Sequence, residues 1–171
     1  MSLTIEEFDD YLENWRIEIS RACGKNVSRE KIFDALFMIL GDKYSLEHPL
    51  DLWDIDIKFE SGLKYLKEFD FTSFDHQFEI DLSFDRDMLF STKAKFKAAG
   101  FVLHIHRYDQ DPFPSNPHAH IVDQNIKIDL SNGNCYRSRT FIKTIKKKEL
   151  LEIRKKAEAL NIEVPHLNIS S

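Results

Sequence analysis

The chain has 171 residues, of which 42% are hydrophobic and 31% are charged, and its formal net charge is −5. This length suits one substantial core, so we expect a single domain over residues 1–171, and the composition excludes a disordered chain. The longest apolar run, residues 35–40, excludes a membrane helix, because such a helix needs roughly 20 apolar residues.

Residues 1–41 predict a pair of helices. Thr4, with Glu7 three positions later, forms a capping-box signal ahead of an apolar stripe of helical spacing. Ser28 is the capping candidate for a second stripe, which Gly41 is expected to stop.

The sheet is expected within residues 54–145. A brief third helix is predicted after Gly62, followed by a strand over residues 77–85, where apolar and polar residues alternate cleanly. A helix over residues 85–99 then leads to a second alternating strand over residues 101–108.

The C-terminal part predicts a hairpin and a closing helix. Two short strands, residues 118–123 and 126–130, are expected to turn at Gln124-Asn125, and residues 146–161 have the apolar spacing of a helix. The tail from Pro165 is expected to be loosely held. The predicted class is α+β, with an antiparallel or mixed sheet of about four to five strands covered by N-terminal helices and a C-terminal helix.

Charge is distributed unevenly along the chain. Residues 1–60 carry 14 carboxylates against seven Lys or Arg, whereas residues 137–156 carry nine basic side chains against two glutamates. The basic segment could be a phosphate-binding patch or simply the solvated face of a helix. Opposite charges at the two ends would also suit a homo-oligomer or a charged protein partner.

The N-terminus and the cysteines indicate the compartment. The first residues are acidic and amphipathic, unlike a secretory signal peptide. Cys23 and Cys135 form no CxxC motif and no disulfide framework. We therefore expect a cytoplasmic protein with no membrane association.

Four of the seven histidines form two His-x-His pairs on the predicted strands: His104 with His106, and His118 with His120. Period-2 alternation places each pair on one face of its strand. If the two strands are neighbours, the loop 109–117 joins them, and the four imidazoles converge on one face. The alternative is structural, because histidine is common on the polar face of a half-exposed strand.

Three kinds of chemistry suit such a cluster. Imidazoles bind zinc or other divalent transition metals, and His118 and His120 are the metal candidates. Paired histidines also serve as general base and general acid on a phosphodiester, and imidazolium with arginine can bind phosphate without reacting. The catalytic candidates are His104, His106, His118, His120 and Asp109. The substrate-binding candidates are Arg107, Tyr108, Arg137, Arg139, Lys143 and Lys147.

The stretch "RYDQDPFPSNPHAHI", residues 107–121, resembles the signature of small bacterial toxin–antitoxin proteins of the TumE type. The resemblance covers about 15 of the 171 residues. It implies a small α+β toxin with a cognate antitoxin as partner and RNA as target. The matching positions are Tyr108, Asp109, Pro117, His118 and His120.

The leading hypothesis is therefore a toxin-like protein with a histidine-lined site that binds or cleaves a phosphate-bearing substrate, RNA above all, in the manner of a ribonuclease-like phosphodiesterase. A second hypothesis is a non-enzymatic protein-interaction module with a structural or metal-bound histidine loop. A third is a nucleotidyltransferase-like protein, in which Asp54 and Asp56 on a strand, with Glu79 or Asp81, would hold Mg²⁺. The chain has no P-loop, dinucleotide-binding or GxSxG motif.

Overall fold

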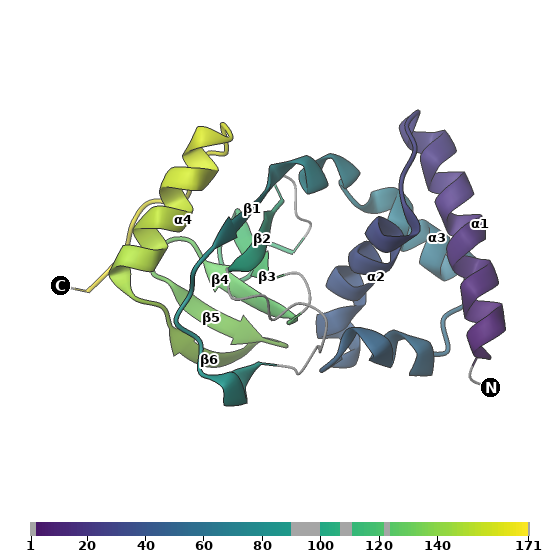
Figure 1. The fold of residues 1–171 in the computed structure, drawn as a ribbon, viewed down its shortest axis with the longest axis horizontal. Helices are drawn as coiled ribbons and strands as arrows, with labels where there is room; N and C mark the ends of the chain where they lie inside the picture. Colours follow the sequence, from purple (N-terminus) through teal and green to yellow (C-terminus); the bar gives the residue numbers. More distant parts are fainter. Residues whose placement is uncertain (1–2, 90–99, 107–110, 122–123, 171) are drawn as a thin grey trace. The chain divides into compact units, whose positions relative to one another are not determined.

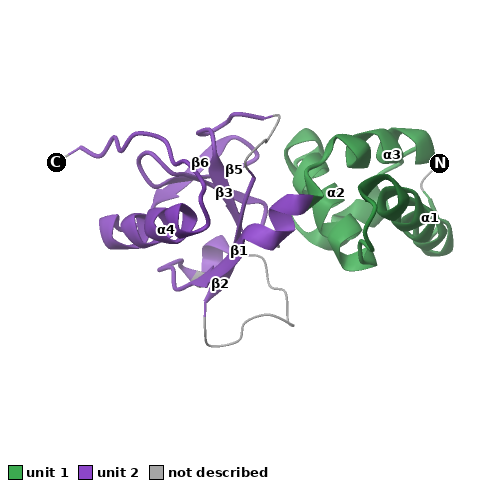
Figure 2. Cartoon of the chain, turned by 90° about the horizontal axis from the view of Figure 1, so that it is seen from above, with its two compact units in different colours: residues 1–71 green, residues 72–171 purple. Residues whose placement is uncertain are grey.

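The computed structural model describes residues 3–89, 100–106, 111–121 and 124–170. The chain divides into two compact units, residues 1–71 and 72–171, which Figure 2 draws in green and purple. The described elements comprise helices and one antiparallel sheet, so the predicted α+β class is confirmed. The sheet has six strands, however, and the predicted count of four to five was too low.

Unit 1 is helical. Its elements in chain order are α1 (Ile5–Cys23), α2 (Arg29–Tyr44), the 3-10 helix η1 (Pro49–Asp54) and α3 (Phe59–Glu68). The predicted capping box at the start of α1 is confirmed, because the Glu7 amide donates to Thr4 Oγ1 at 3.2 Å and the Thr4 amide donates to the Glu7 carboxylate at 2.8 Å. Ser28 Oγ likewise accepts from the Lys31 amide at the start of α2.

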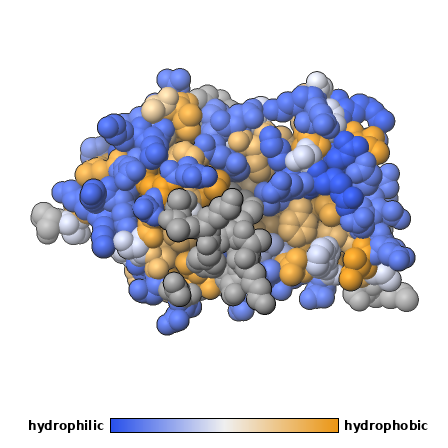
Figure 3. All heavy atoms as spheres, in the orientation of Figure 1, coloured by the Kyte–Doolittle hydropathy of each residue, from blue (hydrophilic) through white to orange (hydrophobic). Residues whose placement is uncertain are grey.

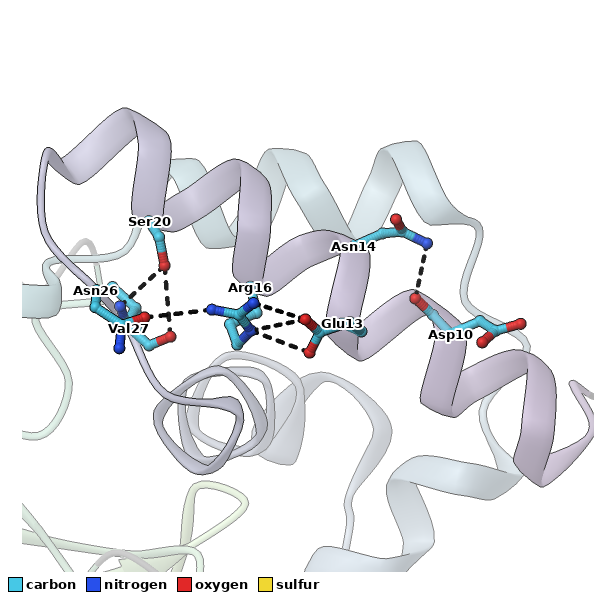
Figure 4. Close-up of polar contacts among 7 residues, drawn as sticks. All are labelled: Asp10, Glu13, Asn14, Arg16, Ser20, Asn26 and Val27. Carbon is cyan, nitrogen blue, oxygen red and sulfur yellow. Dashed lines mark hydrogen bonds and ion pairs between the residues drawn. The ribbon is translucent and has the colours of Figure 1, made fainter.

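Polar contacts connect α1 with the turn that follows it (Figure 4). Ser20 Oγ accepts a hydrogen bond from the Val27 amide at 2.9 Å. Arg16 donates to both carboxylate oxygens of Glu13 and, at 3.2 Å, to the side-chain oxygen of Asn26. These contacts fix the α1–α2 turn from the α1 side.

Two glycines in unit 1 act differently from the prediction. Gly41 does not end α2, which continues to Tyr44 and is capped by Ser45 in the left-handed conformation, φ 51°. Gly62 lies inside α3 rather than before it. A Cβ atom at this position would collide with the Trp15 indole, which explains why the residue is a glycine. Here glycine allows a close approach between two helices and does not mark a helix end.

Unit 2 contains the sheet, whose strands lie in sequence order and are all antiparallel to their neighbours (Figure 1). The strands are β1 (Gln77–Ile80), β2 (Phe101–Ile105), β3 (His118–Ile121), β4 (Ile126–Asp129), β5 (Asn134–Arg137) and β6 (Thr140–Thr144). The predicted β3–β4 hairpin is confirmed, and Asn125 in its turn has φ 48°. Residues 86–88 form the 3-10 helix η3, and most of the predicted helix over residues 85–99 lies outside the described residues.

The helix α4 (Lys147–Ala159) agrees with the closing helix predicted over residues 146–161. Its buried side chains join the core formed by one face of the sheet. The apolar members of this core from the sheet and from α4 include Leu103, Ile105, Ala119, Ile121, Ile126, Ile128, Leu150, Ile153 and Ala157.

The C-terminal tail is held against unit 2, and the prediction of a loose tail was wrong. The Asn168 amide donates to the Ser131 carbonyl at 2.7 Å, and an Arg154 guanidinium nitrogen donates to the Pro165 carbonyl at 2.7 Å. Leu167 and Ile169 pack on the core, so spaced apolar residues keep the tail in place. In the described part of the chain, no helix has the length and apolar character needed to cross a membrane.

Candidate functional site

A single row of side chains crosses all six strands on the face of the sheet opposite the α4 core. We call it the cross-strand row. Residues directly opposite each other in an antiparallel pair share a face, so the register of the five strand pairs defines the row. Its members in strand order are Gln77, His104, His120, Lys127, Tyr136 and Phe141.

The four paired histidines converge on this face, as their alternation predicted. Ring centroids of His104 and His106 lie 4.5 Å apart, those of His106 and His120 lie 5.1 Å apart, and those of His118 and His120 lie 4.5 Å apart. Cross-strand pairing of His104 with His120 brings the two pairs together. The imidazoles therefore form one continuous cluster over β2 and β3.

The cluster is buried, which the alternation along the strands did not predict. The exposed fractions of His104, His106, His118 and His120 are 0%, 4%, 1% and 6%. The 3-10 helix η2 (Phe71–His76) contributes to this cover, because the Phe74 ring lies edge-on to His104 at 4.6 Å. This burial depends on a segment about 30 residues away along the chain, so it cannot be predicted from the alternation of residues within the strands.

Hydrogen bonds give His104 and His118 different roles. His104 Nε2 lies 2.7 Å from Ser73 Oγ, and its Nδ1 lies 3.3 Å from the side-chain nitrogen of Gln77, so side chains hold both ring nitrogens. His118 Nδ1 lies 2.9 Å from the Ser115 carbonyl oxygen. A carbonyl oxygen can only accept, so Nδ1 carries the hydrogen and the lone pair of a neutral His118 is on Nε2. That is the tautomer of a proton acceptor held by the backbone.

A charged group adjoins the histidines on β4. The Lys127 ammonium lies 2.9 Å from the Asp111 carboxylate, which also accepts from Arg139 at 3.0 Å. Partial burial would raise the pKa of Asp111, but the hydrogen bond and charge of Lys127, the Phe113 amide and the charge of Arg139 together lower it. The lowered pKa favours the ionised form of Asp111, which binds Arg139 and Lys127, the cross-strand neighbour of His120.

Three of the predicted substrate-binding residues lie away from the histidines. Arg137 donates to the backbone carbonyls of Gln124 and Met88, at 3.2 and 2.8 Å, and Lys143 donates to the Ser83 carbonyl. Lys147 begins α4, which packs on the opposite face of the sheet. The basic helix therefore does not flank the histidine cluster, contrary to our expectation.

Arg139 is the predicted substrate-binding residue that the structure connects to the cluster, through Asp111. Arg107, Tyr108 and Asp109 lie outside the described residues. Sequence reasoning missed Lys127 and Tyr136, although both lie at alternating positions of their strands that face the polar side of the sheet. That alternation was visible for Lys127 in "IKIDL", between isoleucines that face the core.

The metal prediction gains no support from the described residues, in which no group of three or more His, Cys, Asp or Glu side chains is placed to hold a metal ion. A site at His118 and His120 stays a prediction. The groups that surround the cluster are the Ser73 hydroxyl, the Ser115 carbonyl and the Lys127 ammonium, which supply hydrogen-bond partners and a positive charge.

The strand predicted for Asp54 and Asp56 does not form. Asp54 is the last residue of η1, and the exposed Asp56 follows in an irregular segment, so these two residues do not share a strand. Pro49 opens the 3-10 helix and the His48 ring accepts from the Leu50 amide, which explains the local structure. Glu79 and Asp81 belong to the other unit.

A scan against protein-family models gives no match, and neither the curated proteins nor the solved structures contain a significant one. The TumE-type resemblance of residues 107–121 therefore rests on that stretch of sequence alone. The function is inferred from the site.

Proposed function

We propose that the protein is a toxin-like, ribonuclease-like phosphodiesterase that acts on RNA in the cytoplasm, with His118 and His120 as its reactive pair and a cognate antitoxin as its partner. The observation that carries the proposal is the contact of four imidazoles on one face beside Lys127 and Asp111. Such a group combines proton transfer with a fixed positive charge for a phosphate.

The chemistry needs no group beyond these side chains. One neutral imidazole of the pair accepts the proton of a ribose 2′-hydroxyl as the 2′-oxygen attacks phosphorus. The 2′-oxygen–phosphorus bond forms while the bond from phosphorus to the 5′-oxygen breaks, and the second, protonated imidazole gives its proton to that leaving oxygen. In this proposal Lys127, the cross-strand neighbour of His120, stabilises the negative charge that develops on the phosphoryl oxygens.

Exposure along the cross-strand row is lowest in its middle. His104 is 0% exposed and His120 and Lys127 are 6% exposed, whereas Gln77 at the β1 end is exposed and Phe141 at the β6 end is 54% exposed. Lys127 lies on the β6 side of His120, so we propose that RNA approaches on the side of this cation. His104, whose two ring nitrogens are held by Ser73 and Gln77, supports the reactive pair.

Cleavage of a labelled single-stranded RNA in the presence of a chelator tests the proposal. We expect the wild type to cleave, and His118→Ala and His120→Ala each to lose about 100-fold or more of the rate. His166→Ala, which changes an exposed histidine of the tail, is the matched control and should cleave normally. Absence of wild-type cleavage, or full activity in both variants, would overturn the proposal; cleavage lost in chelator and restored by zinc would replace the acid–base mechanism with a metal-dependent one.

The second candidate is a non-enzymatic interaction module in which the histidines are structural. The burial of the cluster and the two hydrogen bonds of His104 favour it. It predicts that His118→Ala and His120→Ala lower the melting temperature or release a protein partner, while no reaction is lost. Parallel measurements of melting temperature and RNA cleavage on the same variants separate the two.

A further inference from the structure

The β6 end of the cross-strand row is an exposed aromatic cluster. The Tyr136 ring contacts Phe113 on one side, with centroids 4.9 Å apart at 69°, and Phe141 on the other, with centroids 6.0 Å apart at 74°. Phe141 is 54% exposed, although a phenylalanine normally gains by burial. The space-filling view in Figure 3 shows apolar areas as separate patches within a mainly hydrophilic surface. The exposed aromatic cluster thus continues the row whose histidines are buried, and its exposure suggests that it binds a ligand.

A planar cation completes this cluster. The Arg139 guanidinium lies over the Phe113 ring, 4.7 Å from its centroid, and is 57% exposed. Its bond to Asp111 connects it to Lys127, the neighbour of Tyr136 in the row. Two cations share one carboxylate, so the aromatic cluster carries a net positive charge where it meets the row.

We infer that Phe141, Tyr136, Phe113 and Arg139 bind an unpaired base of single-stranded RNA, so that the substrate of the proposed phosphodiesterase is single-stranded; the inference rests on that proposed function. Aromatic rings and arginine planes stack on exposed bases whatever their identity, whereas the bases of a duplex are stacked on one another and unavailable. The nearby positive charge suits the adjoining phosphates. An apolar protein partner would not use the positive charge of Arg139 and Lys127.

The dimensions of the row agree with this assignment. Phe141 lies on β6, and three strand spacings separate it from His120 on β3. At about 4.8 Å per spacing the two positions are about 14 Å apart, which a segment of a few nucleotides can span. A base held on the aromatic cluster thus directs the backbone along the row, past Lys127 and toward the histidines.

Binding of a 2′-O-methyl oligonucleotide tests the inference, because this probe lacks the 2′-hydroxyl and cannot be cleaved. With the full-length protein, fluorescence anisotropy should show tighter binding of the single strand than of the same sequence in a duplex. Phe141→Ala should weaken single-strand binding by about 5- to 100-fold, as expected for the loss of one stacked base. Phe141→Tyr should restore the affinity. Leu151→Ala, at another exposed apolar side chain (42%), should bind as the wild type does.

Equal affinity of the wild type and Phe141→Ala, equal affinity for single strand and duplex, or failure of the wild type to bind the probe would overturn the inference. A protein partner released by Phe141→Ala with oligonucleotide affinity unchanged would assign the cluster to that partner instead. The proposed cleavage is tested independently of this binding, because cleavage is measured on unmodified RNA. Phe141-dependent binding without cleavage would refute the reaction and leave the base site standing.

Discussion

Around the four paired histidines, the two faces of the six-stranded sheet are buried to a similar degree but are made of different side chains. On the face covered by α4, Leu103, Ile105 and Ile128 are completely buried. On the other face, His104 and His118 are 0% and 1% exposed. Apolar burial stabilises a fold by about 25 cal/mol per Å², whereas buried polar groups must recover their lost hydration through hydrogen bonds. Apolar burial explains the stability of the first face, whereas the polar side chains of the second face are the basis of the proposed function.

The largest effect should follow from a cavity on the α4 face. We expect Leu103→Ala to lower the free energy of unfolding of unit 2 by about 2–5 kcal/mol, because its side chain is fully enclosed. Both tryptophans, Trp15 and Trp53, lie in unit 1, so urea unfolding of unit 2 should be followed by labelling of the buried Cys135 thiol in a Cys23→Ser background. Leu151→Ala is the exposed control. A loss under 1 kcal/mol for Leu103→Ala would contradict the description of this face.

Two histidines on the other face should separate stability from function. His104→Ala loses the bonds to Ser73 and Gln77 and should lower the free energy of unfolding by about 2 kcal/mol, against about 1 kcal/mol for His118→Ala, which loses the bond to the Ser115 carbonyl. The order should reverse for RNA cleavage, with His118→Ala the more damaging. If the variant that cleaves worst is also the one that is least stable, the histidines act through folding.

Glu149 should make the anchoring of α4 dependent on pH. Its carboxylate accepts from the Ser83 amide at 2.7 Å and the Lys146 amide at 2.8 Å. Burial would raise the pKa of Glu149, but the Ser83 side-chain and backbone interactions and those of Lys146 lower it overall. A lowered pKa means that this stabilisation is complete above the pKa of an unfolded glutamate, about 4.3, and disappears as the pH falls through the folded value.

We therefore expect Glu149→Gln to reduce unfolding free energy at pH 7 by about 1–2 kcal/mol, with the difference vanishing in strong acid. Urea titrations of the variant and the wild type between neutral and acidic pH, followed by the backbone amide NMR signals of unit 2, provide the measurement. Lys148→Gln, at an exposed neighbour, is the control. A difference that persists unchanged at the acid end would refute the assigned role of the carboxylate.

The smallest effect concerns the two thiols and leaves stability unchanged. Burial, the dominant influence, raises the pKa of Cys135 to about 12, so this thiol stays protonated at neutral pH, while Cys23 is exposed. A thiol-reactive dye should label one cysteine quickly in the native protein and the second only after unfolding. Rapid labelling of both would show that the α4 face is more open than described.

Alternation along the strands predicted much of the candidate site from the sequence. The positions of His104, His106, His118 and His120 on one face follow from a period of two, and the β3–β4 hairpin follows from its turn residues. The capping box at Thr4 was also local. These features depend on neighbours within a few positions, which a sequence displays directly.

The remaining features depend on contacts between distant segments. The strands β5 and β6 are joined by Ser138 and Arg139, both at positive φ, and neither is the glycine or asparagine typical of such a turn. The burial of His104 depends on η2, and the side of the sheet that α4 covers depends on the topology. For the same reason the basic helix was wrongly expected beside the histidines.

The most direct test of the polar face uses the imidazole nitrogens themselves. Long-range ¹H–¹⁵N spectra should be recorded with and without a single-stranded 2′-O-methyl oligonucleotide. We expect the ring signals of His118 and His120 to shift on binding while those of exposed His166 stay in place. Unchanged His118 and His120 signals under saturating oligonucleotide would show that the rings only fill the interior.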